Sequence, residues 1–486
     1  MKAMNRISQS RAVPILLLAI LVAAAIVWWG TTSRGQAAGD AATAEGRRLI
    51  EAVVRTVRTA YIERNIAEAK LYAGAGKLVL ETAGKPCAQT LSGATTMSTA
   101  PELFALIDRV RERCTGAPEV ARLYLASARG LLEALGDPYT RLMEPSAFKE
   151  FMQETRGFFY GIGIYIDLKE SHLIVVQPIA NTPAARAGLR AGDRITRIDG
   201  TATQGMALQE AVSRIRGPEG TTVRLAIQRS DREFDVSIVR ARINFITAQG
   251  PSELDEATRL AMRGAGIGYI NLVTFNHERA AAIFDQELTR VRTERARALI
   301  LDLRNNGGGL LDQSLEIADR FVPRGATILQ MFDRNGRQDT SKARTRDRMT
   351  IPVVILVNEF SASASEIVAG ALQDNKAATI VGVRTFGKNY VQNIVGLPPN
   401  TLPMGAGIAI STSKWLTPSG RDINKKGLIP DIVVGVPEEA LRDRLKGRPE
   451  AEIDVRVQRM KLEQLQRAID ILKRRLQRGL QAKAAA

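Results

Sequence analysis

The sequence predicts a multidomain α/β protein, with a helical N-terminal region, a β-rich domain, a layered α/β core and a C-terminal amphipathic helix. Three observations lead to this fold class. The chain has 486 residues, enough for roughly three domains of ordinary size. Its composition, 45% hydrophobic and 24% charged, is that of a globular protein. Its hydrophobic period changes near Gly157 from helical to strand-like, and strands alternate with helices from Gly266 onward.

Residues 1–35 contain the uncharged apolar run from Ala12 to Trp29, which follows a cluster of basic residues. This length, with a positive flank, favours a membrane anchor that leaves the remaining chain outside the cytoplasm. Cleavage as a signal peptide, after the small residues near Gln36-Ala37-Ala38, is the alternative.

Residues 36–156 have mostly helical periodicity, with a looser Gly/Thr/Ser stretch near 90–99. This region contains the chain's two cysteines, Cys87 and Cys114. Because oxidising compartments permit disulfides, export makes a bond between these two residues plausible. Two unrelated buried thiols are the other interpretation, and the sequence leaves both open.

Residues 157–243 read as a compact β-rich domain. Short runs such as GIGIYIDL, HLIVVQPI and TVRLAIQR are apolar or alternate in the way that strands do. A single clear helix, Ala207 to Ile215, interrupts them. Residues 244–436 alternate strands with helices, and helices are expected at His277 to Arg292, Leu310 to Phe321 and Ser363 to Gln373. That alternation predicts a layered α/β core.

Residues 437–486 contain leucines and isoleucines at spacings of three and four, with Arg and Lys between them, as in KLEQLQRAIDILKRRLQRGLQ. This pattern predicts an amphipathic helix with an apolar seam. The seam could pair with a second subunit or pack on the protein's own body. Both interpretations stay open.

The composition also excludes several classes of function. The net charge is +17, but Arg is spread along the chain and no aromatic-basic motif occurs, so nucleic-acid binding is not expected. Two cysteines and two distant histidines, His172 and His277, cannot form a multi-histidine or four-thiolate metal centre. We therefore expect neither a metal nor an organic cofactor.

The segment FSASASEIVAGALQD (360–374) follows an apolar strand and opens a helix. Ser363 and Glu366 match a capping box, which is the ordinary meaning of Ser-x-x-Glu. A serine at a strand-to-helix turn is also a common position for a nucleophile. No Asp-His pair has a recognisable place beside it. Lys388, in the otherwise uncharged stretch TFGKNYVQ, could act as the base if burial keeps it neutral, and Gln392 shares its face.

Two further motifs need weighing. The glycines of LDLRNNGGGLLD (301–312) could form an anion-binding corner or only a flexible turn. The run from Gly382 to Lys388 matches a phosphate loop, but Asn389 stands where a magnesium-binding Ser or Thr is required. The Ser411 to Lys414 match to penicillin-binding enzymes lacks their companion motifs and is attributed to chance.

The order of these segments resembles the carboxy-terminal processing, or tail-specific, proteases. The resemblance runs from about Ala121 to Val434 and rests on several long motifs in the same order, which makes it specific. These motifs are LGDPYTRLMEP (135–145), FFYGIGIYID (158–167), PAARAGLRAGDRITRIDG (183–200), LDLRNNGGGLL (301–311), SASASEIVAGALQD (361–374), TFGKNYVQ (385–392) and LTPSGRDINKKGLIPDI (416–432).

The resemblance implies a serine-lysine endopeptidase with a PDZ domain inserted before the catalytic core. Matched position by position, Ser363 is the nucleophile, Lys388 the general base and Gln392 its positioning partner. The amides of Ala364 and Gly308 would form the oxyanion hole. The sequence departs from the family at Gly307, usually proline, and at Asn389, usually glycine.

The resemblance also implies a site that reads chain ends. A loop at Phe159–Gly163 with free amides would accept a terminal carboxylate, and the strand Ile162 to Asp167 would accept the peptide as an added strand. An apolar final residue would enter a pocket involving the 207–215 helix. The residues expected to bind are Phe159, Tyr160, Gly161, Ile162, Gly163 and Ile164.

The expected substrates are therefore proteins with disordered C-terminal tails. The expected location is the bacterial inner membrane, with the catalytic body in the periplasm. An activating or adaptor protein and homo-oligomers formed through the terminal helices are expected as partners. A non-catalytic PDZ adaptor that presents tails to another protease is the alternative function.

Overall fold

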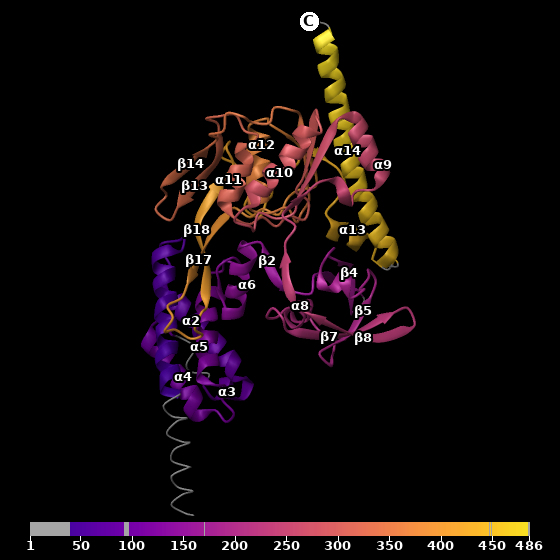
Figure 1. The fold of residues 1–486 in the computed structure, drawn as a ribbon. Coiled ribbons are helices and arrows are strands. Elements are labelled where there is room, and N and C mark those ends of the chain that lie inside the picture. Colours follow the sequence, from indigo (N-terminus) through magenta and orange to yellow (C-terminus); the bar gives the residue numbers. More distant parts are fainter. Residues whose placement is uncertain (1–38, 92–96, 170, 447, 449, 485–486) are drawn as a thin grey trace, which may run out of the picture. The chain divides into compact units, whose positions relative to one another are not determined.

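The structure is a computed structural model that describes residues 39–91, 97–169, 171–446, 448 and 450–484 (Figure 1). The chain forms two compact units, Met1–Phe148 with Gln392–Ser413 and Lys149–Val391 with Lys414–Ala486. The predicted anchor, Ala12 to Trp29, lies outside the described residues. Within the part that the structure describes, no helix combines the length and apolar character needed to cross a bilayer.

The first unit is mainly helical. Residues 39–60 are helical, and α2 packs against α5 with fully buried side chains such as Val79 and Leu131. Cys87 and Cys114 are joined by a disulfide, with Cα atoms 5.4 Å apart. The other elements are α2 (Glu68–Ala83), α3 (Lys85–Thr90), α4 (Ala100–Arg113), α5 (Val120–Glu133) and β1 (Arg141–Met143), which pairs antiparallel with β18 (Gly407–Leu416).

The second unit begins with a β-rich domain that follows α6 (Pro145–Thr155). Its antiparallel sheet has the order β3-β4-β5-β7-β8, with β6 beside β5, and β2 pairs separately with β9. Its elements are β2 (Phe158–Gly161), β3 (Ile164–Lys169), β4 (His172–Pro178), α7 (Pro183–Arg186), β5 (Arg194–Ile198), β6 (Thr201–Ala202), α8 (Leu208–Ile215), β7 (Thr222–Arg229), β8 (Arg232–Val239) and β9 (Ala241–Asn244).

The α/β core of this unit is a six-stranded sheet of order β10-β11-β12-β15-β16-β19. The pairs from β11 to β19 are parallel, as strands joined by crossover helices must be. Its strands are β10 (Ala248–Gln249), β11 (Ile267–Leu272), β12 (Ala298–Asp302), β15 (Val353–Val357), β16 (Thr379–Gly382) and β19 (Ile432–Val433). A hairpin of β13 (Thr327–Asp333) and β14 (Gln338–Lys342) lies outside this sheet.

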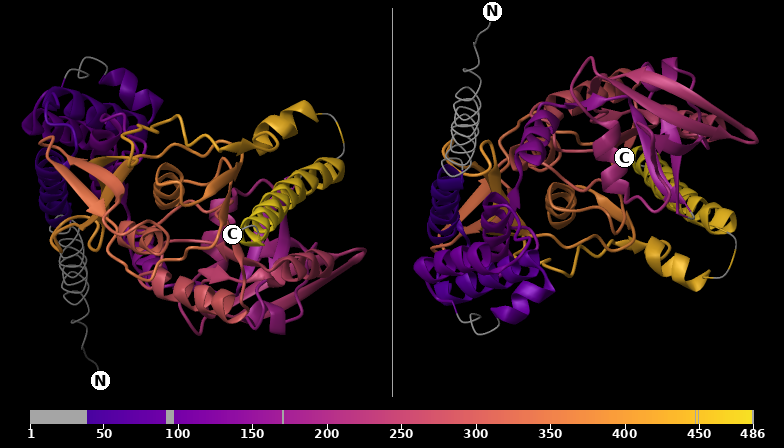
Figure 2. Two further views of the ribbon diagram at one scale, coloured as in Figure 1. Left: turned by 90° about the horizontal axis from the view of Figure 1, so that it is seen from above. Right: turned by 90° about the horizontal axis from the view of Figure 1, so that it is seen from below.

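Helices cover both faces of the core sheet (Figures 1 and 2). Successive side chains of a strand point to opposite faces of the sheet, and on β12 both faces are apolar. Leu299 and Leu301 pack with α10, α11 and α12, whereas Ile300 packs with α9 and α14. The helices, with η2 before α9, are η2 (Pro251–Glu253), α9 (Glu256–Ala265), α10 (Ala280–Thr293), α11 (Leu311–Asp319), α12 (Ala364–Asp374), α13 (Glu438–Arg444) and α14 (Glu450–Ala484).

The predicted α/β architecture is confirmed. The helices predicted near 207–215, 310–321 and 363–373 correspond to α8, α11 and α12 within a few residues. The apolar seam of the C-terminal helix packs on the protein's own sheet, because Leu465, Ile469 and Leu472 are buried against β11, β12, β15 and β16. Leu462, three positions before Leu465 in the same apolar pattern, is 54% exposed.

Candidate functional site

Ser363 lies at the turn between the buried strand β15 and helix α12. Its backbone has φ 55° and ψ −113°, a conformation that costs free energy for any residue with a side chain. The neighbouring serines hold the turn in place, since Ser361 Oγ donates to Leu303 O at 2.8 Å and Ser365 Oγ donates to Asn306 O at 2.8 Å. Both neighbours are fully buried, whereas Ser363 is partly exposed, so the middle serine is the one available to a substrate.

The glycine turn that follows β12 lies directly against the Ser363 turn. The Ala362 N–H donates to Asn306 O at 3.1 Å. A Cβ atom at Gly308 would lie 2.9 Å from both Ala364 N and Ser363 Cβ, and φ at Gly308 is 98°. Only glycine fits there. The amide of Ala364 is the first of α12 and has no acceptor within its own helix, so a helix N-terminus points into this corner.

The Gly308 N–H itself donates to Asn306 Oδ1 at 2.9 Å. Asn306 is fully buried, and its Nδ2 donates to Leu272 O at 2.7 Å at the end of β11. The side chain of Asn306 therefore fixes the corner to the sheet. Gly308 can serve as an oxyanion donor only if it exchanges this bond for one to the substrate.

The carboxylate of Glu366, fully buried in the first turn of α12, connects the two predicted catalytic segments. Its Oε2 accepts from Ser363 N at 2.8 Å and from Lys388 N at 2.9 Å. Its Oε1 accepts from Thr385 Oγ1 at 2.5 Å and from Gly387 N at 2.7 Å. Burial raises the pKa of Glu366, and these four donors act against that rise because they stabilise the anion.

Lys388 is partly buried and lies beside the departure from the family at Asn389. The Asn389 side chain is 1% exposed, and its Nδ2 donates to Asp422 Oδ1 at 2.9 Å. Its Oδ1 has no hydrogen-bond partner among the described residues. Gln392 follows on β17 (Tyr390–Gly396) and belongs to the first unit, where its Nε2 donates to Tyr139 O. Its pairing with Lys388 stays a prediction.

The other departure, Gly307, leaves the corner intact. Gly307 is exposed, and a Cβ atom there would meet nothing within 4 Å. A side chain at this position would therefore meet no neighbour at its Cβ atom.

A groove of about 220 Å³ runs along the β-rich domain beside β3. It is lined by five of the six predicted binding residues and by Ile179, Val212, Ile215 and Arg216, among others. Tyr160 is not among the lining residues, and its ring packs edge-on against Phe158. Strand β3 is at the edge of its sheet, so its outer side can accept another strand.

The loop predicted at Phe159–Gly163 is shorter in the structure, because the chain through Gly161 forms β2 and pairs with β9, which leaves Ile162 and Gly163 as the turn before β3. Ile162 O accepts from Ala184 N at 2.9 Å, and Gly163 O accepts from Ile179 N at 2.9 Å, so both carbonyls face the domain. Gly163 has φ 81°, and a Cβ atom there would lie 2.4 Å from Thr182 Cβ. The turn therefore needs glycine to approach α7 this closely.

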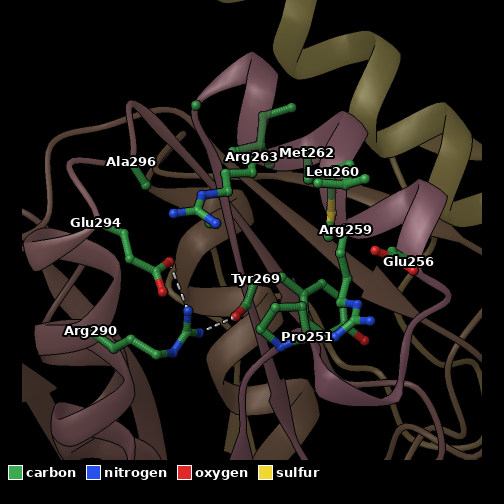
Figure 3. A pocket seen from close by; sticks show the side chains of 13 residues that line it. Pro251, Glu256, Arg259, Leu260, Met262, Arg263, Tyr269, Arg290, Glu294 and Ala296 are labelled. Carbon is green, nitrogen blue, oxygen red and sulfur yellow. Dashed lines mark hydrogen bonds and ion pairs between the residues drawn. The ribbon is translucent and has the colours of Figure 1, made fainter.

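A second cavity, of about 430 Å³, lies at the start of β11 (Figure 3). Its walls contain none of the predicted site residues. Arg290 in its wall donates to Glu294 Oε2 at 2.9 Å and to Tyr269 O at 2.7 Å, as Figure 3 shows. The guanidinium is therefore already satisfied by the protein, and this cavity is not part of the candidate site.

The sequence reasoning did not find Asn306 or Thr385 and treated Glu366 only as a helix cap. The sequence signal for Asn306 was its position in RNNGGG, where a polar side chain directly before a run of glycines can hydrogen-bond to the glycine turn and fix its conformation. No local signal indicated that Thr385, Gly387 and Lys388 donate to Glu366, because these donors lie about twenty residues further along the chain.

Comparison with known proteins identifies two domain families in the chain. Residues 266–434 match the model of peptidase family S41, and residues 174–229 match that of a PDZ domain. A carboxy-terminal-processing protease of Bartonella bacilliformis is 36% identical over 371 residues, 71% of this chain and 80% of that protein. A carboxyl-terminal-processing protease of Synechocystis sp. is 37% identical over 309 residues, 63% of this chain and 70% of that protein.

Among solved structures, a photosystem II D1 C-terminal processing protease aligns with a TM-score of 0.46 and 27% identity. The alignment covers 80% of this chain and 92% of that one. The sequence relatives carry the assignment. The chain belongs to the carboxy-terminal-processing proteases of peptidase family S41, and it is a serine-type peptidase with a PDZ domain.

Proposed function

We propose that the protein is an exported endopeptidase that captures C-terminal tails through its PDZ groove and cleaves peptide bonds with Ser363 and Lys388. Neutral Lys388 Nζ takes the proton from Ser363 Oγ as that oxygen attacks the substrate carbonyl. The amides of Ala364 and Gly308 donate hydrogen bonds to the developing oxyanion, and Gly308 N gives up its bond to Asn306 Oδ1 to do so. Lys388 then protonates the leaving amine, and water releases the acyl-enzyme. Gln392 would orient Lys388 without adding charge.

One observation carries this proposal. Ser363 N and Lys388 N donate to the same oxygen of Glu366, at 2.8 and 2.9 Å. The two backbones are therefore held within two hydrogen bonds of each other. Ser363 has a strained backbone at a helix N-terminus, and the segment that contains Lys388 is hydrogen-bonded to the same carboxylate. This is the arrangement expected of a nucleophile with its base.

Tail capture is supported by the groove beside β3. An extended peptide would add to the open edge of β3, and its terminal carboxylate would meet amides of the turn between β2 and β3, at Ile162 and Gly163. Val212 and Ile215 on α8 offer an apolar wall for the last side chain. Such a groove binds the C-terminal end of a polypeptide, so unfolded proteins with free C-terminal tails are the proposed substrates.

Export is supported by the disulfide between Cys87 and Cys114, since such bonds persist in oxidising compartments. The apolar run from Ala12 to Trp29 would either anchor the protein in the inner membrane or be removed after secretion. Extraction of membranes with alkaline carbonate distinguishes the two, because an anchored protein stays in the pellet and a secreted one does not.

The decisive test is cleavage of an unfolded reporter that ends in Ala-Ala by the purified protein alone. We expect turnover by the wild type and loss of turnover in both Ser363→Ala and Lys388→Ala. Activity in the wild type without additions would also exclude an obligatory activator or adaptor. Full cleavage by either variant would refute the proposed dyad, and tail binding without cleavage in every variant would favour the adaptor function.

A further inference from the structure

Two exposed phenylalanines stand beside the proposed catalytic residues. Phe360 is 50% exposed and precedes Ser363 by three positions, and Phe386 is 52% exposed and precedes Lys388 by two. All thirteen phenylalanines of the chain lie within the part that the structure describes, and these two alone count as exposed. Large exposed apolar groups that gather at one place commonly mark a binding surface.

The backbone brings the two segments side by side. Phe386 N donates to Ser361 O at 3.1 Å, so the chain that leads to Lys388 runs along the chain that leads to Ser363. Ser361 follows Phe360, and Thr385 precedes Phe386. Both of these polar residues are held in the interior, because Ser361 Oγ donates to Leu303 O and Thr385 Oγ1 donates to Glu366 Oε1.

Burial alternates along residues 384–387, where Thr385 and Gly387 are buried and Phe386 is exposed. The Thr385 side chain is held inward by its hydrogen bond to Glu366, whereas the side chain of the next residue, Phe386, is exposed. The hydrogen bond that holds Thr385 is made to Glu366, which also binds the backbone of Ser363 and Lys388. The exposure of the Phe386 ring therefore accompanies the contacts that hold these two residues.

We propose that Phe360 and Phe386 form an apolar subsite that contacts large apolar side chains next to the bond that is cut. This inference rests on the proposed function and adds a second level of selection to it. The PDZ groove selects the end of a chain, whereas the subsite selects which bond within that chain is cleaved. Each half-exposed ring leaves on the order of 100 Å² open in the free enzyme, which a bound peptide would cover.

The experiment compares two reporters that share one unfolded body and one C-terminal tail. The first has a cleavage segment rich in Leu and Phe, and the second has Ser and Gly at the same positions. Full-length wild type, Phe360→Ala and Phe386→Ala are compared by kcat/KM on each. Leu260→Ala is the matched control, because Leu260 is 60% exposed on α9, which packs on the opposite face of the core sheet from α12.

We expect each phenylalanine variant to lower kcat/KM about tenfold on the apolar reporter and less than about twofold on the polar one. Phe386→Leu should recover most of the loss, and Leu260→Ala should match wild type on both reporters. Equal losses on both reporters, or no loss, would overturn the subsite. Cleavage by Ser363→Ala would instead overturn the proposed function, so the two failures can be told apart.

Discussion

The Glu366 carboxylate allows a quantitative test of how the dyad is held, because four donors share its two oxygens. In Glu366→Gln a single oxygen remains, and the new amide group faces the other pair of donors. If that oxygen stays toward Ser363 N and Lys388 N, the Thr385 hydroxyl can turn and accept from the amide. The Gly387 N–H and the Thr385 O–H then both lose the acceptor Oε1. The opposite orientation leaves two backbone amides, Ser363 N and Lys388 N, without an acceptor, and these cannot rotate as a hydroxyl can, so the first orientation is favoured.

The magnitudes follow from these counts. Each buried donor without an acceptor costs about 1–3 kcal/mol, and removal of a buried charge offsets part of that cost. With two such donors, we expect Glu366→Gln to lower the free energy of unfolding by no more than about 6 kcal/mol and to keep kcat within about tenfold. Glu366→Ala removes all four acceptors and frees both catalytic segments, and displacement of this kind lowers kcat by roughly 100-fold or more.

The assay measures kcat and KM on the unfolded reporter, together with thermal unfolding and binding of a tail peptide to the PDZ groove. Tail binding controls for folding, because the groove lies on a separate sheet from Glu366. Thr385→Ser, which keeps the hydroxyl, should remain close to wild type, whereas Thr385→Val should lose activity. Full kcat in Glu366→Ala, with tail binding intact, would refute the view that this carboxylate sets the spacing of nucleophile and base.

Three further predictions concern other parts of the chain. Gly308→Ala should abolish turnover with tail binding unchanged, because its Cβ would lie 2.9 Å from Ala364 N; kcat and peptide binding check this. Burial would raise the pKa of Asp193, but hydrogen bonds from Arg229 hold it below its usual value. Arg229→Ala should therefore destabilise the PDZ domain at pH 7, and the difference from wild type in urea unfolding should disappear as the pH falls below the lowered pKa of Asp193. Replacing both Cys87 and Cys114 with serine opens a loop of sequence separation 27 and should cost about 3.5 kcal/mol of unfolding free energy without changing kcat, as chemical denaturation and steady-state kinetics would show.

The fold class was predictable because periodicity and turn residues are local properties. The start of α12 immediately after Ser363 is an example, since the small-residue turn and the capping pattern lie within a few positions. The order of motifs identified the family for the same reason. Each motif is a continuous stretch that can be read without knowledge of tertiary contacts.

The details of the site were not predictable, because they depend on residues far apart in sequence. Glu366 reads as a helix cap from its neighbours, and its bonds to Gly387 and Lys388 become visible only in the folded chain. The bond from Gly308 N to Asn306 Oδ1 is local, but glycine-rich turns adopt many conformations and the sequence does not choose among them. The apolar seam of α14 would look the same against a second subunit or against its own sheet.

The backbone conformation of Ser363 is strained, so a serine at this position lowers the stability of the fold. At φ 55° and ψ −113°, glycine is the residue that relieves the strain, and glycine has no hydroxyl. With Ser363 as the proposed nucleophile, a substitution that gains stability at this codon would remove the reacting hydroxyl. On that proposal, selection for activity keeps the serine, and an inactive descendant of this chain should lose it early.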